Sequence, residues 1–308
     1  MLRKPLLLAA RSKTCRTIVE RTPVTRGLVS RFVAGSTLES ALPAVAELTT
    51  DRYVTLDYLG EDTTDLEQAN ATVTAYEDLL AALGEAGLGG RAEVSVKLSA
   101  VGQFLNRDGE KIALDNARRI AEAAAAIGTT VTLDMEDHTT TDSTLGILRE
   151  LRQDFPSVGA VLQAYLHRTE ADCRDLSGPG SRVRLCKGAY DEPASVAYRD
   201  KAEVDRAYVR CLRILMEGDG YPMVASHDPR MVAIAGELAK TNGRSADDYE
   251  YQMLYGIRDT EQVRLAAEGK RVRVYVPYGD EWYGYYMRRL AERPANVLFM
   301  ARSVITRN

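Results

Sequence analysis

Eight short segments of apolar or alternating character occur along the chain, and each leads into a stretch with the apolar spacing of a helix. The segments are 52–60, 92–100, 129–137, 158–166, 181–190, 221–228, 248–256 and 270–279. Regular alternation of strands and helices favours a parallel sheet with right-handed crossovers. Eight such units in about 250 residues match the usual size of a closed barrel. The sequence therefore predicts an α/β fold, a (β/α)8 TIM-type barrel.

The residues before this series form a separate part of the prediction. Residues 1–50 show mixed three- and four-residue spacing of apolar positions, so we expect an N-terminal helical arm (1–50) followed by the barrel (51–308). An open, doubly wound sheet is the structural alternative, and the lack of a G-x-G-x-x-G after an early strand disfavours it. The basic start, residues 1–16, is interpreted as a helix that packs on the core or contacts a surface.

Composition narrows the class of protein. The 308 residues are 45% hydrophobic and 27% charged with a net charge of -4, which is typical of an ordinary globular protein and does not indicate a nucleic-acid partner. No apolar run is long enough to cross a bilayer. The four cysteines are scattered without paired spacing, which favours free thiols in a reducing compartment.

Strand parity predicts which side chains face the barrel interior. Where apolar residues of a strand face the helices, the residues between them face inward. This rule places five polar or charged side chains in the interior, mostly toward the ends of their strands: Lys97, Asp134, Gln163, Arg184 and Tyr275. Buried charges are costly unless they are paired, so their convergence at one mouth indicates a functional site.

A metal site and a Schiff-base lysine are two further chemistries to weigh at this site. Asp134, Glu136 and His138 stand at alternate positions, but the chain has only three histidines and no ligand spacing among them, so no metal site is predicted. Lys97 or Lys187 could form a Schiff base if burial lowered the pKa of its amine. A carboxylate partner such as Asp134 would instead keep Lys97 protonated.

Cations near the end of the fifth strand indicate an anionic or electron-rich ligand. Arg184, Lys187 and Gly188 lie in "RLCKGAY", and the glycine permits close approach of the backbone. Near the C-terminus, "YGYYMRRLAER" places Tyr285, Arg288 and Arg289 on one stripe of a helix. If this stripe covers the barrel mouth, two guanidinium groups would bind a carboxylate; a solvated, salt-bridged helix face is the alternative.

At these residues the sequence resembles the flavin-dependent proline dehydrogenase family. The matching pieces are "VSVKLSA", "TLDMED", "LQAYL", "RLCKGAY", "ASHD", "EYQMLYG" and "VYVPYGDEWYGYYMRRLAER", in one order across roughly residues 50–300. The resemblance implies a (β/α)8 barrel that holds FAD non-covalently and oxidises L-proline to Δ1-pyrroline-5-carboxylate. The reduced flavin would then pass its electrons to a membrane quinone.

The resemblance also implies roles for individual residues. Asp134 and Arg184 would be catalytic, the first beside the substrate and the second near the reactive edge of the flavin. Proline would be bound by Lys97, Tyr275, Arg288 and Arg289. FAD would be lined by Met135, Gln163, Arg184, Lys187, Gly188, Ala189, Ser226 and His227.

Further expectations concern partners and location. The chain is expected to be monofunctional, with a separate pyrroline-5-carboxylate dehydrogenase acting on its product. A cytoplasmic location is expected, with peripheral contact at the inner face of the membrane as an added possibility, because the electron acceptor is a membrane quinone. Two other functions stay open at this point: a flavin-free barrel lyase or aldolase, and a catalytically silent barrel that binds an amino acid or a protein.

Overall fold

Eight parallel strands close into a barrel in the order in which they occur in the chain. A computed structural model describes residues 29–292, with side chains from 29 to 287. The strands are β1 (Tyr53–Tyr58), β2 (Ala92–Val96), β3 (Val131–Leu133), β4 (Gly159–Gln163), β5 (Arg182–Cys186), β6 (Tyr221–Ala225), β7 (Glu250–Leu254) and β8 (Val272–Tyr278). Each pairs with its neighbours, and β8 closes the ring on β1. The predicted TIM-type barrel is confirmed, with strands shorter than the sequence segments.

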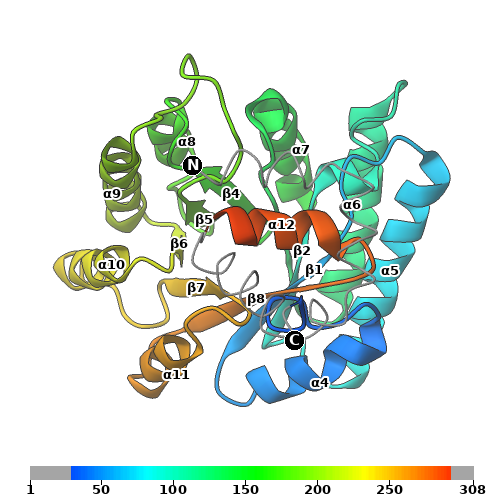
Figure 1. Cartoon of the computed structure of the whole chain (residues 1–308), viewed down its shortest axis with the longest axis horizontal. Helices are drawn as coiled ribbons and strands as arrows, with labels where there is room; N and C mark the ends of the chain where they lie inside the picture. The colour runs from blue at the N-terminus through cyan, green and yellow to red at the C-terminus, as the bar shows by residue number, and fades with distance from the viewer. Residues whose placement is uncertain (1–28, 293–308) are drawn as a thin grey trace, which may run out of the picture.

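Helices surround the strands and form the outer layer (Figure 1). They are α4 (Leu38–Leu48), α5 (Leu66–Glu85), α6 (Gly109–Ala126), α7 (Thr141–Asp154), α8 (Thr169–Asp175), α9 (Lys201–Glu217), α10 (Pro229–Thr241) and α11 (Asp259–Ala267). A further helix, α12 (Trp282–Glu292), lies across one end of the barrel, and short 3-10 turns η1 (Leu98–Val101) and η2 (His138–Thr140) follow β2 and β3. Aspartates begin several of them: the side chains of Asp65, Asp200 and Asp228 accept hydrogen bonds from backbone N–H groups of the first turns of α5, α9 and α10.

The predicted N-terminal arm falls only partly within the described residues. There, Thr37 caps α4, and the chain before it crosses to the end of β8, where Ala34 N–H donates to the Pro277 carbonyl (2.9 Å). Residues 34–36 are not helical, so the expectation of helix throughout 1–50 is wrong for this segment. Residues 1–28 lie outside the described residues, and the division at residue 50 stays a prediction.

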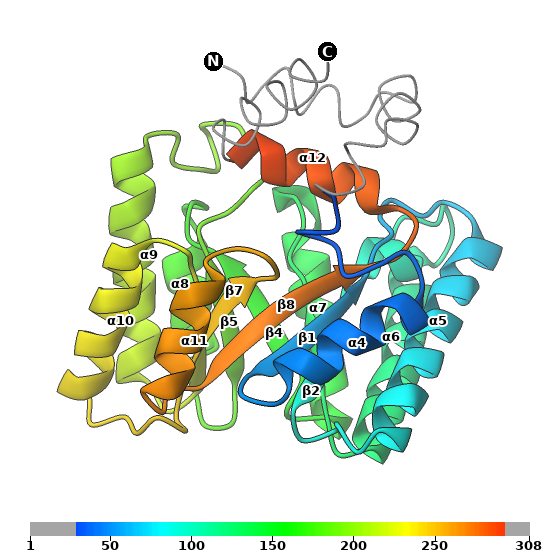
Figure 2. The same ribbon diagram turned by 60° about the horizontal axis from the view of Figure 1, so that its bottom comes forward.

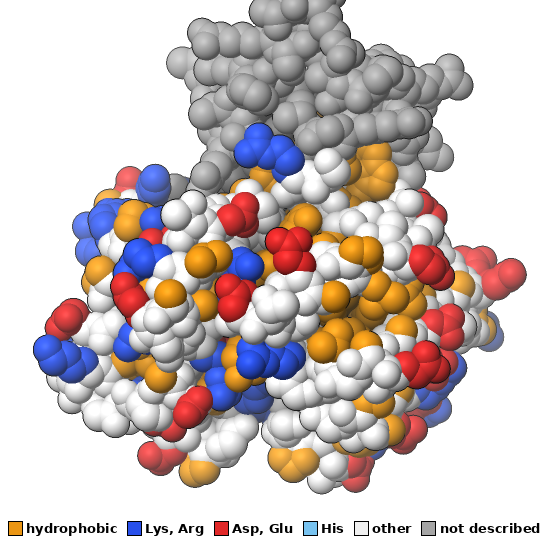
Figure 3. Space-filling view, turned by 90° about the horizontal axis from the view of Figure 1, so that it is seen from below, with side chains coloured by type: hydrophobic (Ala, Val, Ile, Leu, Met, Phe, Trp, Pro, Cys, Tyr) orange, Lys and Arg blue, Asp and Glu red, His pale blue; other side chains and the backbone are white. Residues whose placement is uncertain are grey.

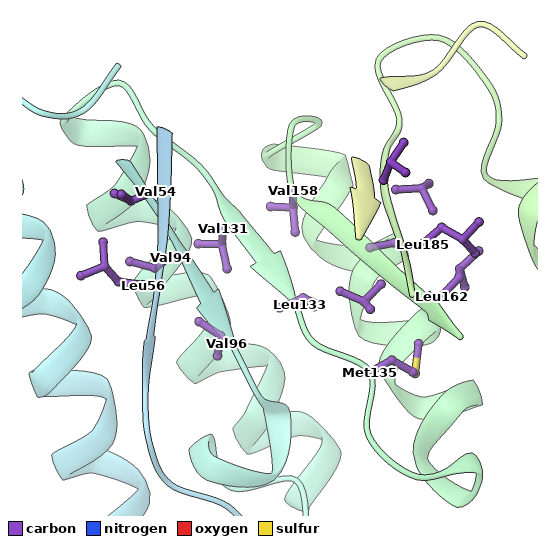
Figure 4. Packing of buried hydrophobic residues seen from close by; sticks show 14 of the residues in the cluster. Val54, Leu56, Val94, Val96, Val131, Leu133, Met135, Val158, Leu162 and Leu185 are labelled. Carbon is purple, nitrogen blue, oxygen red and sulfur yellow. The ribbon is translucent and has the colours of Figure 1, made fainter. Parts of the chain in front are cut away.

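The main hydrophobic core lies between the barrel and its helices. Strand residues at alternate positions point outward into it, and Figure 4 shows this set on neighbouring strands: Val54, Leu56, Val94, Val96, Val131, Leu133, Leu162 and Leu185. Each is nearly or fully buried. Burial of one such side chain stabilises a fold by roughly 1.5–3 kcal/mol. The parity that places these residues outward leaves the intervening polar side chains inside the barrel.

A second hydrophobic cluster covers part of the C-terminal mouth. Figures 1 and 2 show α12 lying across this end of the barrel, over the strand ends. The cluster joins buried residues of α12 to the 29–35 segment and to loops after β1 and β7: Phe32, Val33, Leu59, Ile257, Tyr283, Tyr285, Tyr286 and Met287. Tyr275 of the interior packs against it. The tyrosines of α12 (Tyr283, Tyr285 and Tyr286) are therefore buried where the helix packs over the mouth, and they are not exposed to solvent.

The surface carries both signs of charge. Figure 3 shows acidic and basic side chains interspersed over one face of the molecule, with hydrophobic side chains grouped between them. Across residues 29–292, none of the helices combines the length and the hydropathy that a membrane crossing requires.

Candidate active site

Four of the residues predicted to face inward meet at the C-terminal mouth of the barrel. Asp134 is at the centre: its Oδ1 accepts from Arg184 Nη1 (2.7 Å) and its Oδ2 accepts from the Tyr275 hydroxyl (2.7 Å). Lys97 Nζ lies 3.6 Å from Asp134 Oδ2 and 3.4 Å from the Tyr275 hydroxyl. Arg184 and Tyr275 come from β5 and β8, and Lys97 and Asp134 directly follow β2 and β3, so only the closed barrel brings the four side chains together.

Local backbone structure positions two of these side chains. The backbone N–H of Asp134 donates to the Val96 carbonyl (2.8 Å), which continues strand pairing one residue beyond the end of β3. Lys97 follows β2 directly and precedes η1, where the chain turns away from the barrel. Both side chains are thus held at the last inward positions of their strands.

Asp57 is a fifth member of the cluster that the sequence analysis did not single out. It is fully buried near the end of β1, and its Oδ2 lies 2.6 Å from Lys97 Nζ, closer than Asp134 does. The expected pairing of Lys97 with Asp134 is therefore the weaker of its two ion pairs. The same parity rule would have found Asp57, because it alternates with the outward residues Val54 and Leu56 in "RYVTLDYLG".

The charges of neighbouring side chains, together with burial, shift the pKa values of Lys97, Asp134 and Tyr275. Burial disfavours the ammonium form of Lys97, but the carboxylates of Asp57 and Asp134 outweigh burial and raise its pKa. Burial alone would raise the pKa of Asp134, yet the charges of Lys97 and Arg184 lower it. Burial and the nearby Asp134 raise the pKa of the Tyr275 hydroxyl. At neutral pH, Lys97 is therefore a cation and not the free amine that a Schiff base requires.

Glu136 is a further buried carboxyl at the mouth. It accepts hydrogen bonds from the Ser99 hydroxyl (2.6 Å) and the Ser99 backbone N–H (3.2 Å). The same Ser99 receives the backbone N–H groups of Asp62 and Thr63 from the loop after β1. Burial raises the pKa of Glu136 from 4.5 to about 7, partly offset by the hydrogen bond from Ser99.

This shift predicts a pH-dependent stability for Glu136→Gln. A folded pKa above the unfolded value means that the stability from Glu136 is full below pH 4.5 and lost as pH rises through about 7. Glutamine does not titrate, so the variant should gain in unfolding free energy relative to the parent by up to about 3 kcal/mol across this window. Urea unfolding at pH 4.5 and pH 8 measures the difference. Glu85→Gln at the exposed end of α5 is the control, and an equal drift in both variants would contradict the assignment.

The carboxylates and histidine of "TLDMEDH" do not share one face. Asp134 points into the barrel, Glu136 turns to Ser99, and His138 begins η2, where its ring and its backbone N–H contact Glu192. The chain leaves strand geometry after Leu133, so the alternation expected from the sequence does not continue.

The residues expected to line FAD fall into two groups. Gln163 is buried at the end of β4, and its Nε2 donates to the Glu136 carbonyl (2.7 Å), so it borders the cluster. Met135 is buried in the main core with the outward side chains (Figure 4). Its side chain follows the predicted parity, and a role in FAD binding stays a prediction.

The other expected FAD residues follow β5 and β6. β5 ends at Cys186, and Lys187 Nζ lies between α9 and α10, 2.5 Å from Asp205 and 3.0 Å from Asp228. Lys187 and Arg184 therefore make separate sets of ion pairs. Gly188 has φ +109°, and a Cβ there would come within 2.2 Å of the Tyr165 ring, so both conformation and space require glycine.

Three positions complete the set. Ala189 follows Gly188 and is partly buried. Ser226 Oγ accepts from Asp228 N–H (3.2 Å), and His227 Nε2 accepts from Leu254 N–H (2.9 Å), which joins the end of β6 to the end of β7. A role of these residues in FAD binding stays a prediction.

Arg288 and Arg289 belong to α12, but their side chains lie outside the described residues. Binding of a substrate carboxylate by these two arginines therefore stays a prediction. The helix that carries them does lie across the mouth, as the prediction required (Figure 2).

Fold and site together define the class: a TIM-barrel protein with a buried ionic cluster at the C-terminal ends of its strands, where enzymes of this fold carry their active sites. A family model described as proline dehydrogenase matches residues 41–302. The chain belongs to the proline dehydrogenase family. It is accordingly an oxidoreductase that oxidises proline in the first step of proline catabolism, with a flavin as cofactor.

Relatives of similar length support this assignment. The chain is 42% identical to proline dehydrogenase of Deinococcus radiodurans, over 95% of this chain and 97% of the relative. It is 39% identical to proline dehydrogenase 1 of Bacillus subtilis strain 168, over 99% of each.

Solved structures show the same fold within longer chains. Proline utilization A (PutA) from Bdellovibrio bacteriovorus, inactivated by N-propargylglycine, superposes with a TM-score of 0.79 at 27% identity over 86% of this chain. PutA from Bradyrhizobium japonicum superposes with a TM-score of 0.74 at 25% identity over 88% of this chain. This chain spans 32% and 31% of those two chains.

Proposed function

We propose that the barrel mouth binds L-proline beside FAD and that the product is Δ1-pyrroline-5-carboxylate. The observation that carries this proposal is the convergence of Lys97, Asp134, Arg184 and Tyr275, four of the residues assigned from the resemblance, in one cluster. When bound, the flavin accepts the hydride that leaves the proline ring carbon next to nitrogen.

The residues present fit a flavin. Arg184 is buried, and its Nη2 has no hydrogen-bond partner among the described residues, although Nη1 and Nε are both bonded. A buried donor without a partner is costly, so a ligand acceptor at this atom would be favoured. A guanidinium also stabilises the electron-rich ring of a reduced flavin by its charge. Gln163, Lys187, Gly188, Ala189, Ser226, His227 and Met135 would hold the rest of FAD.

The chain's own groups would orient the substrate. Lys97, kept as an ammonium by Asp57 and Asp134, attracts the proline carboxylate, and Arg288 and Arg289 would bind the same carboxylate from α12. The Tyr275 ring would pack against the proline ring while its hydroxyl stays bonded to Asp134. Contacts on two sides would restrain the proline ring, because hydride transfer needs the reacting carbon within about 3–3.5 Å of its acceptor.

The groups that would bind the proline carboxylate and ring do not take the proton that leaves the proline nitrogen. Oxidation removes one hydride and one proton from proline, and the proton leaves from the ring nitrogen. Tyr275 donates its hydrogen to Asp134, and Lys97 is already protonated, so neither group can accept that proton. We expect the nitrogen to lose its proton to solvent, so that the rate rises with pH.

The electrons would pass from reduced FAD to a membrane quinone at a peripheral contact. We propose a cytoplasmic location at the inner face of the membrane and a separate pyrroline-5-carboxylate dehydrogenase for the product. Residues 1–16 are one candidate for the membrane contact, which lies outside the described residues.

The decisive experiment uses flavin absorbance. Purified protein supplied with FAD should be yellow, and anaerobic L-proline should bleach the oxidised-flavin band. A short quinone should restore the band. Colourless protein that remains inactive with FAD would refute the proposal and favour a lyase or a silent barrel. N-propargylglycine, which inactivated the Bdellovibrio PutA, should cause time-dependent loss of activity.

Arg288→Met and Arg289→Met should weaken proline binding far more than FAD binding. Loss of a charge-assisted contact costs about 1.5–3 kcal/mol, which is roughly a 10- to 150-fold rise in KM for proline. Steady-state kinetics gives KM, and flavin fluorescence titration gives the affinity for FAD. Equal losses of both affinities in both variants would rule out the carboxylate clamp.

A further inference from the structure

Arg184 is the first member of a chain of hydrogen-bonded polar side chains inside the barrel. Its Nε donates to Gln252 Oε1 on β7 (2.5 Å), while its Nη1 donates to Ser95 Oγ (2.8 Å) and Asp134 Oδ1 (2.7 Å). Gln252 is buried with 3% of its surface exposed. Three of the five N–H donors of a guanidinium are thereby used, and the two on Nη2 have no hydrogen bond to a described residue.

The next member of the chain fixes the orientation of the Gln252 amide. Gln252 Nε2 donates to Glu250 Oε1 (2.6 Å), and Glu250 in turn accepts from Arg273 Nε (2.7 Å) and Nη2 (3.1 Å). Burial raises the pKa of Glu250, but the charge of Arg273 outweighs it, and the pKa falls to about 2. An ionised carboxylate can only accept, so the NH2 end of the amide must face Glu250 and its oxygen must face Arg184.

We infer that Gln252 is a positioning residue that fixes the plane of the Arg184 guanidinium and so holds its charge beside Asp134 at the mouth. This inference rests on the proposed function, because it takes the ligand in the mouth to be the flavin. The guanidinium is planar, so bonds at Nε and Nη1 together determine the plane and the direction of Nη2. Asp134 and Ser95 alone hold only Nη1 and leave the group able to rotate about that contact.

The consequence for the flavin is electrostatic. A positive charge held beside the ring stabilises its reduced, electron-rich state more than its oxidised state. Arg184 Nη2 already lies 3.8 Å from the buried Glu93 Oε1. Without Gln252, the guanidinium should move closer to that carboxylate and away from the mouth. The flavin would then be harder to reduce, although no group that touches proline has changed.

The test measures the midpoint potential of the flavin in the FAD-loaded protein without proline, by equilibration with a reference dye. Gln252→Leu keeps a similar volume and removes both hydrogen bonds. It should lower the equilibrium constant for two-electron reduction at least tenfold, which is about 30 mV more negative. In turnover, kcat should fall while KM for proline changes little.

Gln262→Leu is the matched control. Gln262 is also fully buried, and its Oε1 accepts from an arginine, Arg52 Nη1 (3.0 Å), but it lies on α11 outside the barrel. Its loss should reduce stability without moving the potential. Arg184→Met identifies which idea fails. If it shifts the potential and Gln252→Leu does not, the positioning role is overturned and the place of Arg184 beside the flavin survives. If neither shifts it, Arg184 is not beside the flavin and both assignments are overturned, while bleaching of the flavin by proline tests the proposed function separately.

A second variant keeps the inference testable if Gln252→Leu does not fold. In Gln252→Glu, a protonated carboxyl can donate to Glu250 and accept from Arg184, so it repeats both bonds of the amide. The ionised form cannot donate and would face Glu250 as a like charge. Its potential should therefore match the parent at low pH and depart from it as pH rises. A constant difference from the parent at every pH would overturn the inference.

Discussion

Asp134→Asn should lower kcat/KM for proline by about a thousandfold. Asp134 is the carboxylate on which Arg184, Tyr275 and Lys97 converge. Asparagine has nearly the same shape but no charge, and its NH2 end would oppose one of the donors. Removal of one partner from a buried ionic group typically costs 3–5 kcal/mol, enough for a loss of this size if the reaction requires the intact cluster.

The measurement separates chemistry from folding and from cofactor loss. Steady-state kinetics should be paired with thermal unfolding and with flavin content from absorbance. Asp142→Asn is the control, because that carboxylate in the first turn of α7 is 88% exposed and pairs with a surface arginine, Arg168. Retention of activity within tenfold in Asp134→Asn, with FAD bound, would show that Asp134 has no part in the reaction.

Asp57→Asn should lower kcat/KM for proline by about a hundredfold, mostly through KM. Asp57 is the nearer partner of Lys97, at 2.6 Å against 3.6 Å for Asp134. Without it, the ammonium should move toward Asp134 and compete with Arg184 and Tyr275 for that carboxylate. A charge-assisted buried bond contributes about 1.5–3 kcal/mol, which corresponds to this range.

Thr55→Val provides a control on the same strand and the same face. Thr55 is fully buried two residues before Asp57, and its hydroxyl has no hydrogen-bond partner among the described residues. Removal of an unbonded hydroxyl should leave kinetics unchanged and stability equal or higher. If Asp57→Asn also leaves KM unchanged while thermal stability falls, Asp57 supports the fold and not the position of Lys97.

For Arg184, strand parity predicted the direction of the side chain but not its hydrogen-bond partners. Alternation in "RVRLC" was enough to place Arg184 inside the barrel, because successive side chains of a strand must point to opposite faces. It could not show that the Nε of Arg184 bonds Gln252 on β7 while its Nη1 bonds Asp134 after β3. Such contacts cross the barrel, and they depend on the tilt and stagger of strands that are not neighbours.

Loop residues were less predictable than strand residues. Glu136 lies within the segment predicted as the third strand (129–137) and His138 directly follows it, yet each binds a different partner beyond the end of β3. Lys187 follows β5 and pairs with Asp205 of α9 and with Asp228, which caps α10. Outside a strand, the backbone no longer imposes a period of two, so tertiary contacts decide where a side chain points.

By itself, the sequence determined the barrel, the residues that face its interior and, through motifs in one order, the family. These follow from local rules: period-two alternation, helical spacing and residue identity at strand ends. Only the tertiary structure decided which charges neutralise one another: that Asp57 and not Asp134 is the closer partner of Lys97, and that Gln252 holds Arg184. Electrostatic pairing depends on distances of a few ångströms between chain segments far apart in sequence, and closure of the barrel alone determines those distances.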